Sequence, residues 1–166
     1  MNESIFQLLT DDHVRLDRLL REVAARLPVP GSEAYADFRR GLHRHISVEE
    51  EYILPAILRL ARRESQVVQR LRLDHRALRA LVALPPAEGI VRLIGHNLLV
   101  HHAGEEQEGG LYWQAVRAMG TTAEEVLARL RAPFTDGDPP WSPAPEALRE
   151  AKEAVRLAGY VFPLSS

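Results

Sequence analysis

Two short motifs in this chain combine a histidine with glutamates at helical spacing. His45 is followed four residues later by Glu49, His101 is followed four residues later by Glu105, and a second glutamate comes directly after each. Residues four apart lie on one face of an α-helix, so each imidazole and its carboxylate would point the same way. A single pair of this kind is usually a surface contact that contributes roughly 0.2–0.5 kcal/mol. Two such pairs in matching places of a repeat instead indicate a shared site.

The rest of the repeat lies before these motifs. Residues 12–19 and 74–81 share the pattern Asp-His-x-x-Leu-x-x-Leu, which places His13 and His75 on the apolar stripes of two further helices. Each half of the chain thus supplies one histidine from its first helix and a His-x3-Glu pair from its second. Paired about a pseudo-twofold axis, the two halves would bring four histidines and two glutamates together.

The chemistry of these six side chains favours a metal site. Burying two carboxylates and four imidazoles without a compensating charge costs several kcal/mol per ion, whereas a whole domain is stable by only about 5–15 kcal/mol. Bound cations would neutralise the carboxylates and accept neutral imidazoles. The candidate metal ligands are His13, His45, Glu49, His75, His101 and Glu105. They are too many for one tetrahedral zinc and suit two metals bridged by carboxylates, with iron or manganese favoured over calcium or magnesium.

The three remaining histidines leave one question of register open. His102 also has a glutamate, Glu106, four residues later, so the second motif could be shifted by one residue. The repeat and the helical phase favour His101 as the ligand. His43 and His96 lie off the ligand direction, and we expect them at the surface or behind the ligands.

Other residues near the motifs have two interpretations each. Glu50 and Glu106 are most simply solvated groups or hydrogen-bond partners of the ligands, so Glu50→Ala should leave metal binding nearly unchanged. Tyr52, Tyr112 and Trp113 could serve redox chemistry beside a metal, but aromatic packing in the core is the simpler interpretation.

Helical periodicity extends over most of the chain. Apolar residues recur every three to four positions from about Glu3 to Leu27, from Ser32 through the first motif, from Ser65 to Leu84, and from Ala87 through the second motif. No segment shows the sustained alternation of a strand. The sequence therefore predicts an all-α protein, an up-down four-helix bundle, in which Pro55 bends the second helix beyond the motif.

The chain divides at a proline-rich segment. Residues 1–132 are predicted to form the bundle, with a fifth short helix at residues 121–131. Residues 133–145 contain five prolines and have the composition of a linker. Residues 146–166 contain a last amphipathic helix, ended by Gly159, and a tail. This helix would pack on the bundle or form a homodimer with a second copy of the chain.

Composition excludes several classes of protein. The chain has no cysteine, which removes disulfides, thiolate zinc sites, cysteine-ligated iron–sulfur clusters and thiol nucleophiles. Its net charge of -2 and pI near 6.4 give no electrostatic case for binding nucleic acid or an anionic membrane. No signal peptide or membrane-spanning run is recognisable. We therefore expect a cytoplasmic protein without nucleic-acid or membrane partners.

The order of the motifs resembles that of hemerythrin-like (HHE) cation-binding domains. The shared features are the succession His, His-x3-Glu-Glu, His, His-x3-Glu-Glu, and the sequence Ile53-Leu54-Pro55 after the first motif. The resemblance covers about residues 5 to 118. It implies a non-haem di-iron centre inside the bundle, bridged by an oxo or hydroxo group from solvent, with zinc or manganese as possible substitutes. One iron would be held by His13 and His45, the other by His75 and His101, with Glu49 and Glu105 bridging them.

Two departures from the oxygen-carrying members of that family bear on function. Arg79 stands where they have a further histidine, and His101-x3-Glu105 stands where they have His-x4-Asp. With four matched histidines, each iron would keep a position open to a small ligand. The expected function is to bind or sense dioxygen, nitric oxide, peroxide or iron. The alternatives are a di-iron oxidoreductase acting on peroxide or another small oxidant, and a structural bundle without a functional metal.

Overall fold

The computed structural model of the chain describes residues 5–27, 33–60, 66–119, 123–131 and 144–163. The regular elements among these residues are helices, and none of the described residues forms a strand. Within the same residues, no helix combines the length and the apolar character needed to cross a lipid bilayer. The prediction of an all-α protein is therefore confirmed.

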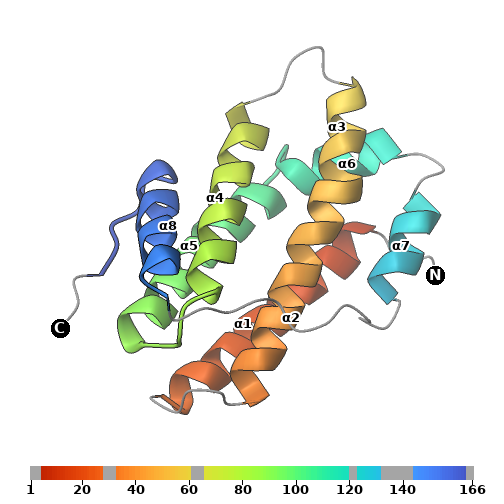
Figure 1. Cartoon of the computed structure of the whole chain (residues 1–166). Coiled ribbons are helices and arrows are strands. Elements are labelled where there is room, and N and C mark those ends of the chain that lie inside the picture. The colour runs from red at the N-terminus through yellow and green to blue at the C-terminus, as the bar shows by residue number, and fades with distance from the viewer. Residues whose placement is uncertain (1–4, 28–32, 61–65, 120–122, 132–143, 164–166) are drawn as a thin grey trace.

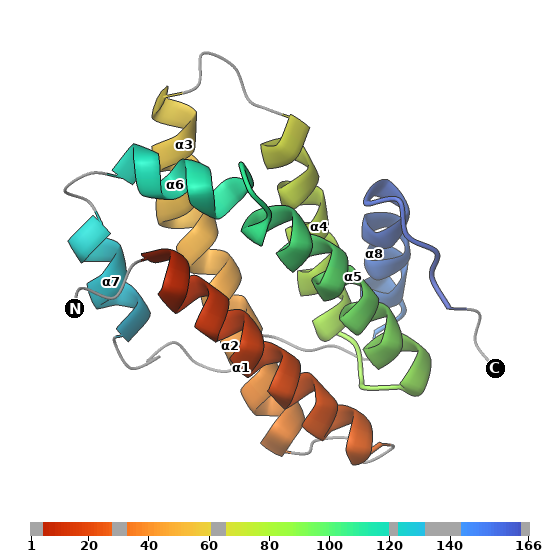
Figure 2. The same cartoon turned by 180° about the vertical axis from the view of Figure 1, so that it is seen from behind.

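Two helical hairpins build the main body. The first hairpin consists of α1 (Ile5–Ala25), α2 (Glu33–Val48), the π-helical turn η1 (Glu49–Ile53) and α3 (Leu54–Leu60). The second hairpin consists of α4 (Gln66–Val82) and α5 (Glu88–Glu106). In Figure 1, α2 and α3 follow one another along one rod with α4 beside it, and Figure 2 shows α1 and α5 from the opposite side. Successive helices alternate in direction, which confirms the up-down four-helix bundle.

Shorter helices come after the bundle. They are α6 (Leu111–Met119), which packs on α3 and α5, α7 (Ala123–Arg131), which packs on α1 and α2, and α8 (Pro145–Leu157), which packs on α4. The helix predicted at residues 121–131 corresponds to α7. The helix starts predicted at Glu3, Ser32 and Ser65, the first two residues of that fifth helix, and most of the linker at 133–145 lie outside the described residues.

The long helices contribute residues to two clusters of buried apolar side chains. The large core cluster includes Leu16, Leu42, Leu78 and Leu98, and the small core cluster includes Leu9, Ile53, Leu71 and Leu111. On α1, His13 lies between Leu9 of the small cluster and Leu16 of the large one. The other three predicted histidine ligands occupy the same level on their helices. The predicted site is therefore a polar layer between two apolar layers.

The second helix is irregular at the first motif rather than beyond it. Pro55 lacks a backbone N–H and cannot complete an ordinary α-helical turn. The structure places the distortion at η1, where the N–H of Leu54 bonds to the carbonyl of Glu49, a five-residue step. A π turn adds one residue to the helix and is common at functional sites. The expected bend after the motif is thus replaced by a wider turn that starts at Glu49.

The C-terminal helix uses its apolar face within the same chain. Ala151, Ala154 and Val155 of α8 are buried in the large core cluster. Gly159, at φ +77°, follows the C-cap residue Ala158, and its N–H bonds to the carbonyl of Arg156 at 3.0 Å, as expected of a glycine that ends a helix. Of the two alternatives for this segment, packing on the bundle is what the structure contains, and a homodimer stays a prediction.

Candidate metal centre

The four histidines and two glutamates of the repeat meet at one level of the bundle. The first metal position consists of His13, His45, Glu49 and Glu105. The second metal position consists of His75, His101, Glu49 and Glu105. Within each set the ligand atoms of all four residues lie within 4.8 Å of one another, and each of these side chains belongs to a residue no more than 2% exposed. All six predicted ligands are therefore brought together.

Glu49 belongs to both metal positions because its two oxygens face different hairpins. Its Oε1 lies 3.3 Å from Nε2 of His45, one helical turn earlier. Its Oε2 lies 3.1 Å from Nε2 of His75, on α4. This is the arrangement that a carboxylate needs to bridge two metals.

Glu105 repeats this arrangement from the other hairpin. Its Oε1 lies 3.2 Å from Nε2 of His101, and its Oε2 lies 3.4 Å from Nε2 of His13. Among the described residues, Nε2 of His101 and Oε1 of Glu105 have no hydrogen-bond partner. A buried imidazole nitrogen and a buried carboxylate oxygen that face each other without a bond are costly unless a cation joins them. The donor set therefore fits a nitrogen- and oxygen-ligated metal.

The first aspartate of the repeat supports the histidine on the second helix of its hairpin, whereas the second aspartate lies further from its histidine. Oδ2 of Asp12 accepts a hydrogen bond from Nδ1 of His45 at 3.0 Å. Asp74 lies 3.9 Å from Nδ1 of His101, which is a charge contact but too long for a hydrogen bond. Carboxylates in this place orient a ligand imidazole and direct its other nitrogen toward the metal.

The second glutamate of each motif reaches across to the opposite hairpin. Glu50 accepts a hydrogen bond from Nδ1 of His75 at 3.1 Å, and Glu106 accepts one from Nδ1 of His13 at 2.5 Å. Of the two interpretations of these glutamates, hydrogen bonding to the ligands is the one that the structure supports. The expectation that Glu50→Ala would be silent therefore has to be replaced.

Arg79 holds Glu50 in this position. Its guanidinium lies 3.2 Å from Oε2 of Glu50, the oxygen that does not bond to His75. It also donates a hydrogen bond to Oγ of Ser47 at 3.3 Å. Arg79 is one helical turn after His75, at the place where oxygen-carrying hemerythrins are expected to have a further histidine. The residue at this place thus positions a ligand's partner.

Without a cation, the two shared carboxylates have opposite protonation preferences. Burial raises the pKa of Glu105 well above its usual range, and the charge of Glu49 raises it further. Burial acts in the same direction on Glu49, but the charge of His45 and hydrogen bonds from the surrounding imidazoles outweigh it and hold the pKa of Glu49 well below its usual range. Two carboxylates this close cannot both ionise easily, and cations would remove the conflict.

The histidines of the first metal position differ in the same way. Burial lowers the pKa of His45, but the charge of Glu49 and the hydrogen bond to Asp12 reverse this and raise it to about 10. Burial, together with the charge of His45, holds the pKa of His13 well below its usual range. Without a metal, the site thus favours a proton on His45 beside Glu49, and a metal would displace that proton.

Comparison with known families identifies the first part of the chain. Residues 4–84 match the family model described as Hemerythrin HHE cation binding domain. The match agrees with the resemblance noted in the sequence and covers the first hairpin and α4. Searches among curated proteins and among solved structures gave no match. The matched residues contain His13, His45, Glu49 and His75. The motif on α5 lies beyond the match, and the structure brings its His101 and Glu105 to the same candidate metal site.

The hydroxyl of Tyr112 lies inside the first metal position. It donates a hydrogen bond to Oε1 of Glu49 at 2.5 Å and lies 2.7 Å from Nε2 of His13. Nε2 of His45 and Oε2 of Glu105 are 3.4 and 3.5 Å away. The ring packs in the small core cluster, as expected of a core aromatic, but the interpretation as simple packing missed the place of the hydroxyl. Burial raises the pKa of this phenol well above its usual range, with Glu105 and then Glu49 adding to the effect.

A glycine pair explains how Tyr112 reaches the ligands. Gly109 has a φ of +76°, and a Cβ on Gly110 would lie 2.6 Å from the carbonyl oxygen of Glu105. The chain therefore reverses directly after the second motif, and α6 starts against the end of α5. Tyr112 points inward from the first turn of α6, whereas Trp113 is half exposed. The double glycine was the sequence signal that could have identified Tyr112.

His102 lies behind the first metal position. Its ring stacks on that of His13, with centroids 3.6 Å apart and planes at 9°, and these two residues form a third candidate ligand group with His45. His101, and not His102, faces the shared carboxylates, which is the register that the repeat favours.

The other two histidines lie away from the ligands. His43 is half-buried, and burial, then the charges of Arg79 and Arg39, lower its pKa to about 4. His96 is exposed and contacts the ring of Tyr160 edge-on, with centroids 5.7 Å apart. Neither residue belongs to a candidate ligand group among the described residues.

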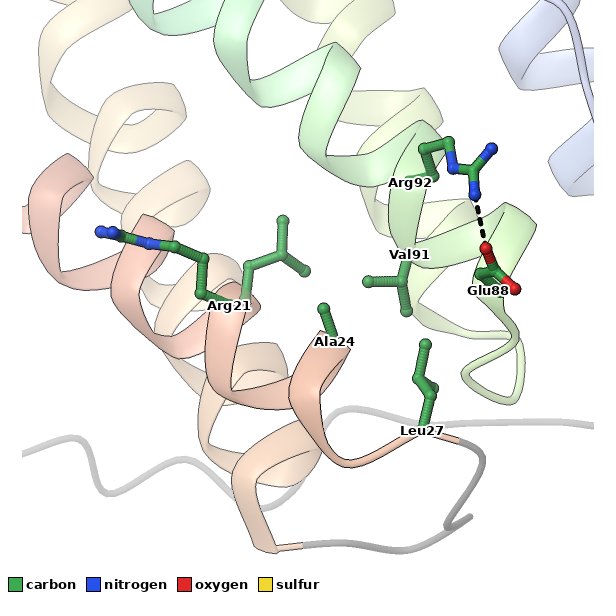
Figure 3. Close-up of a pocket in the computed structure, with 7 residues that line it drawn as sticks. Arg21, Ala24, Leu27, Glu88, Val91 and Arg92 are labelled. Atoms are coloured by element: carbon green, nitrogen blue, oxygen red, sulfur yellow. Dashed lines mark hydrogen bonds and ion pairs between the residues drawn. The ribbon is translucent and has the colours of Figure 1, made fainter.

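An open pocket of about 650 Å³ lies between α1 and α5, away from the metal ligands. Figure 3 shows Ala24, Leu27 and Val91 on its walls and the Arg92–Glu88 ion pair at its edge. Its charged side chains are exposed, and none of the six metal ligands lines it. This pocket therefore adds no residue to the candidate metal site.

Proposed function

We propose that the chain is a non-haem di-iron protein that binds or senses a small ligand such as dioxygen, nitric oxide, peroxide or iron. The observation that carries the proposal is the sharing of two carboxylates. Glu49 and Glu105 each face one histidine of both hairpins, so two cations at the two positions would each have two imidazoles and two carboxylate oxygens.

The donor set supports iron or manganese over calcium or magnesium. Imidazole nitrogens disfavour calcium and magnesium, which prefer oxygen ligands, and the absence of cysteine leaves no thiolate. Four protein donors satisfy tetrahedral zinc but leave coordination positions of iron or manganese free. Bound iron would supply those free positions to a small ligand.

The surrounding residues would keep the ligands in place. Asp12, Glu50 and Glu106 accept hydrogen bonds from Nδ1 of three of the histidines, which leaves Nε2 as the nitrogen directed at the metal. The two core clusters lie on either side of the layer, and the six ligand residues are no more than 2% exposed.

Metal analysis tests this proposal. The chain should be loaded anaerobically with ferrous iron alone, desalted, and measured for iron beside its visible absorption spectrum. We expect about two irons per chain in the wild type, because each position has a full set of donors. Glu49→Ala and Glu105→Ala should each lose most of the iron, since each removes a donor from both positions.

Glu51→Ala is the matched control, because Glu51 is an exposed glutamate on the same turn as Glu49. Equal iron retention in all three variants, or a wild type that stays folded and binds no iron, would overturn the assignment. Consumption of peroxide over many turnovers in the presence of a reductant would favour the oxidoreductase alternative over binding or sensing.

A further inference from the structure

Tyr112 lies at the first metal position although it belongs to neither His-x3-Glu-Glu motif. Its hydroxyl is within 3.5 Å of one donor atom from each of the four residues that form this position. In the described part of the chain, no second tyrosine hydroxyl forms a hydrogen bond with His75 or His101. The phenol thus makes the two positions chemically unlike.

A cation bound to those four donors would have to lie where the phenol oxygen already makes its contacts. Metal–ligand distances for nitrogen and oxygen donors are about 2.0–2.2 Å, so a bound cation sits among the donor atoms. The oxygen of Tyr112 would then either move away or bind the cation itself.

The packing of Tyr112 opposes movement. The residue is fully buried, its ring meets that of Phe6 edge-on at a centroid distance of 6.1 Å, and it lies 5.3 Å from the ring of His13. Its neighbours Leu111 and Ala115 are also fully buried, and the turn at Gly110 allows no added side chain. Withdrawing the hydroxyl would require α6 to shift as a unit.

We propose that Tyr112 supplies an oxygen ligand to the metal held by His13 and His45. The O–H bond breaks as the metal–oxygen bond forms, the proton leaves to the buffer, and no electron is transferred in this step. The hydrogen bond from Tyr112 to Oε1 of Glu49 would be lost at the same time, because the phenolate has no proton to donate. This inference rests on the proposed function, since it requires that the site binds metal.

Ferric iron with a phenolate ligand gives a test that does not depend on activity. The protein loaded with ferrous iron and oxidised in air should show a visible phenolate-to-iron charge-transfer band. Resonance Raman excitation within this band should enhance tyrosine ring vibrations in the wild-type protein. Tyr112→Phe should lose both signals while it keeps half or more of the iron and its helical circular dichroism.

Tyr52→Phe is the matched control, because Tyr52 packs against the same core cluster and forms no hydrogen bond to a metal ligand among the described residues. It should keep the band. An unchanged band in Tyr112→Phe, or a wild type that binds two irons without enhanced tyrosine vibrations, overturns the inference and leaves the di-iron proposal intact. If Tyr112→Phe does not fold, the Raman spectrum of the wild type decides. A wild type that binds no iron overturns both proposals.

Discussion

The two metal positions are built from the same residue types but differ in their surroundings. Each combines two histidines with the shared pair Glu49 and Glu105. At the first position, the Tyr112 hydroxyl contacts all four donors and His102 stacks on His13. At the second, Nε2 of His101 has no hydrogen-bond partner in the described part of the chain. The internal repeat thus makes the ligands symmetric, whereas residues outside the repeat make their surroundings unlike.

The difference arises from the segment that comes directly after each motif. After the first motif the chain continues as a helix, because η1 accommodates Pro55 and leads into α3. After the second motif, Gly109 and Gly110 reverse the chain and α6 brings Tyr112 back onto the ligands. One copy of the motif therefore continues into a rod, and the other is capped by a helix that has no counterpart in the first half.

The largest effect is expected when one histidine is removed from either metal position, which would separate the contributions of the two positions. His13→Ala and His75→Ala should each lower the iron content from about two to about one per chain, because the shared carboxylates and the other histidine pair remain. Only His75→Ala should keep the phenolate band. Iron content and visible absorption, measured beside His96→Ala as an exposed control, check this. Loss of both irons in both variants would show that the positions cannot be separated.

The two shared carboxylates should differ in the metal-free protein. Glu49 accepts hydrogen bonds from Tyr112 and His75, whereas Oε1 of Glu105 has no hydrogen-bond partner among the described residues. Glu49→Gln should therefore lower the free energy of unfolding by about 2–3 kcal/mol, and Glu105→Gln by less than about 1 kcal/mol. Urea unfolding of chelator-treated protein, with Glu51→Gln as the control, measures both. Equal losses would contradict the asymmetry.

A smaller effect is expected from the carboxylates that orient the histidines. Asp12→Asn weakens the support of His45 at the first position, and Glu50→Gln weakens that of His75 at the second. Each should reduce metal affinity at its own position roughly 10- to 100-fold. Competition with a chelator measures the affinity, and Asp11→Asn, an exposed neighbour on α1, should leave it unchanged. Affinities equal to wild type in both variants would contradict the orienting role of these carboxylates and favour the interpretation of Glu50 as a solvated group.

Much of the fold and the ligand set could be predicted from local patterns. Helical spacing placed His45 with Glu49 and His101 with Glu105 on one face, because positions four apart lie together on any α-helix. The position of the π turn could not be predicted, since Pro55 could be accommodated by a bend or by a wider turn. The partners of Glu50 and Glu106 could not be predicted either, because both reach a histidine of the other hairpin.

The amino-acid pattern alone was enough to specify the all-α bundle and the six candidate ligands, because apolar periodicity and a repeated His-x3-Glu spacing are properties of single helices. The three-dimensional fold was needed to establish which carboxylate supports which histidine and which side chain enters the first metal position. Tyr112 is the clearest case. Its ring satisfies the pattern of an ordinary core aromatic, and its hydroxyl meets the ligands only because the Gly109–Gly110 turn folds α6 back onto α5. Contacts between helices that are distant in the chain depend on such turns, which periodicity does not encode.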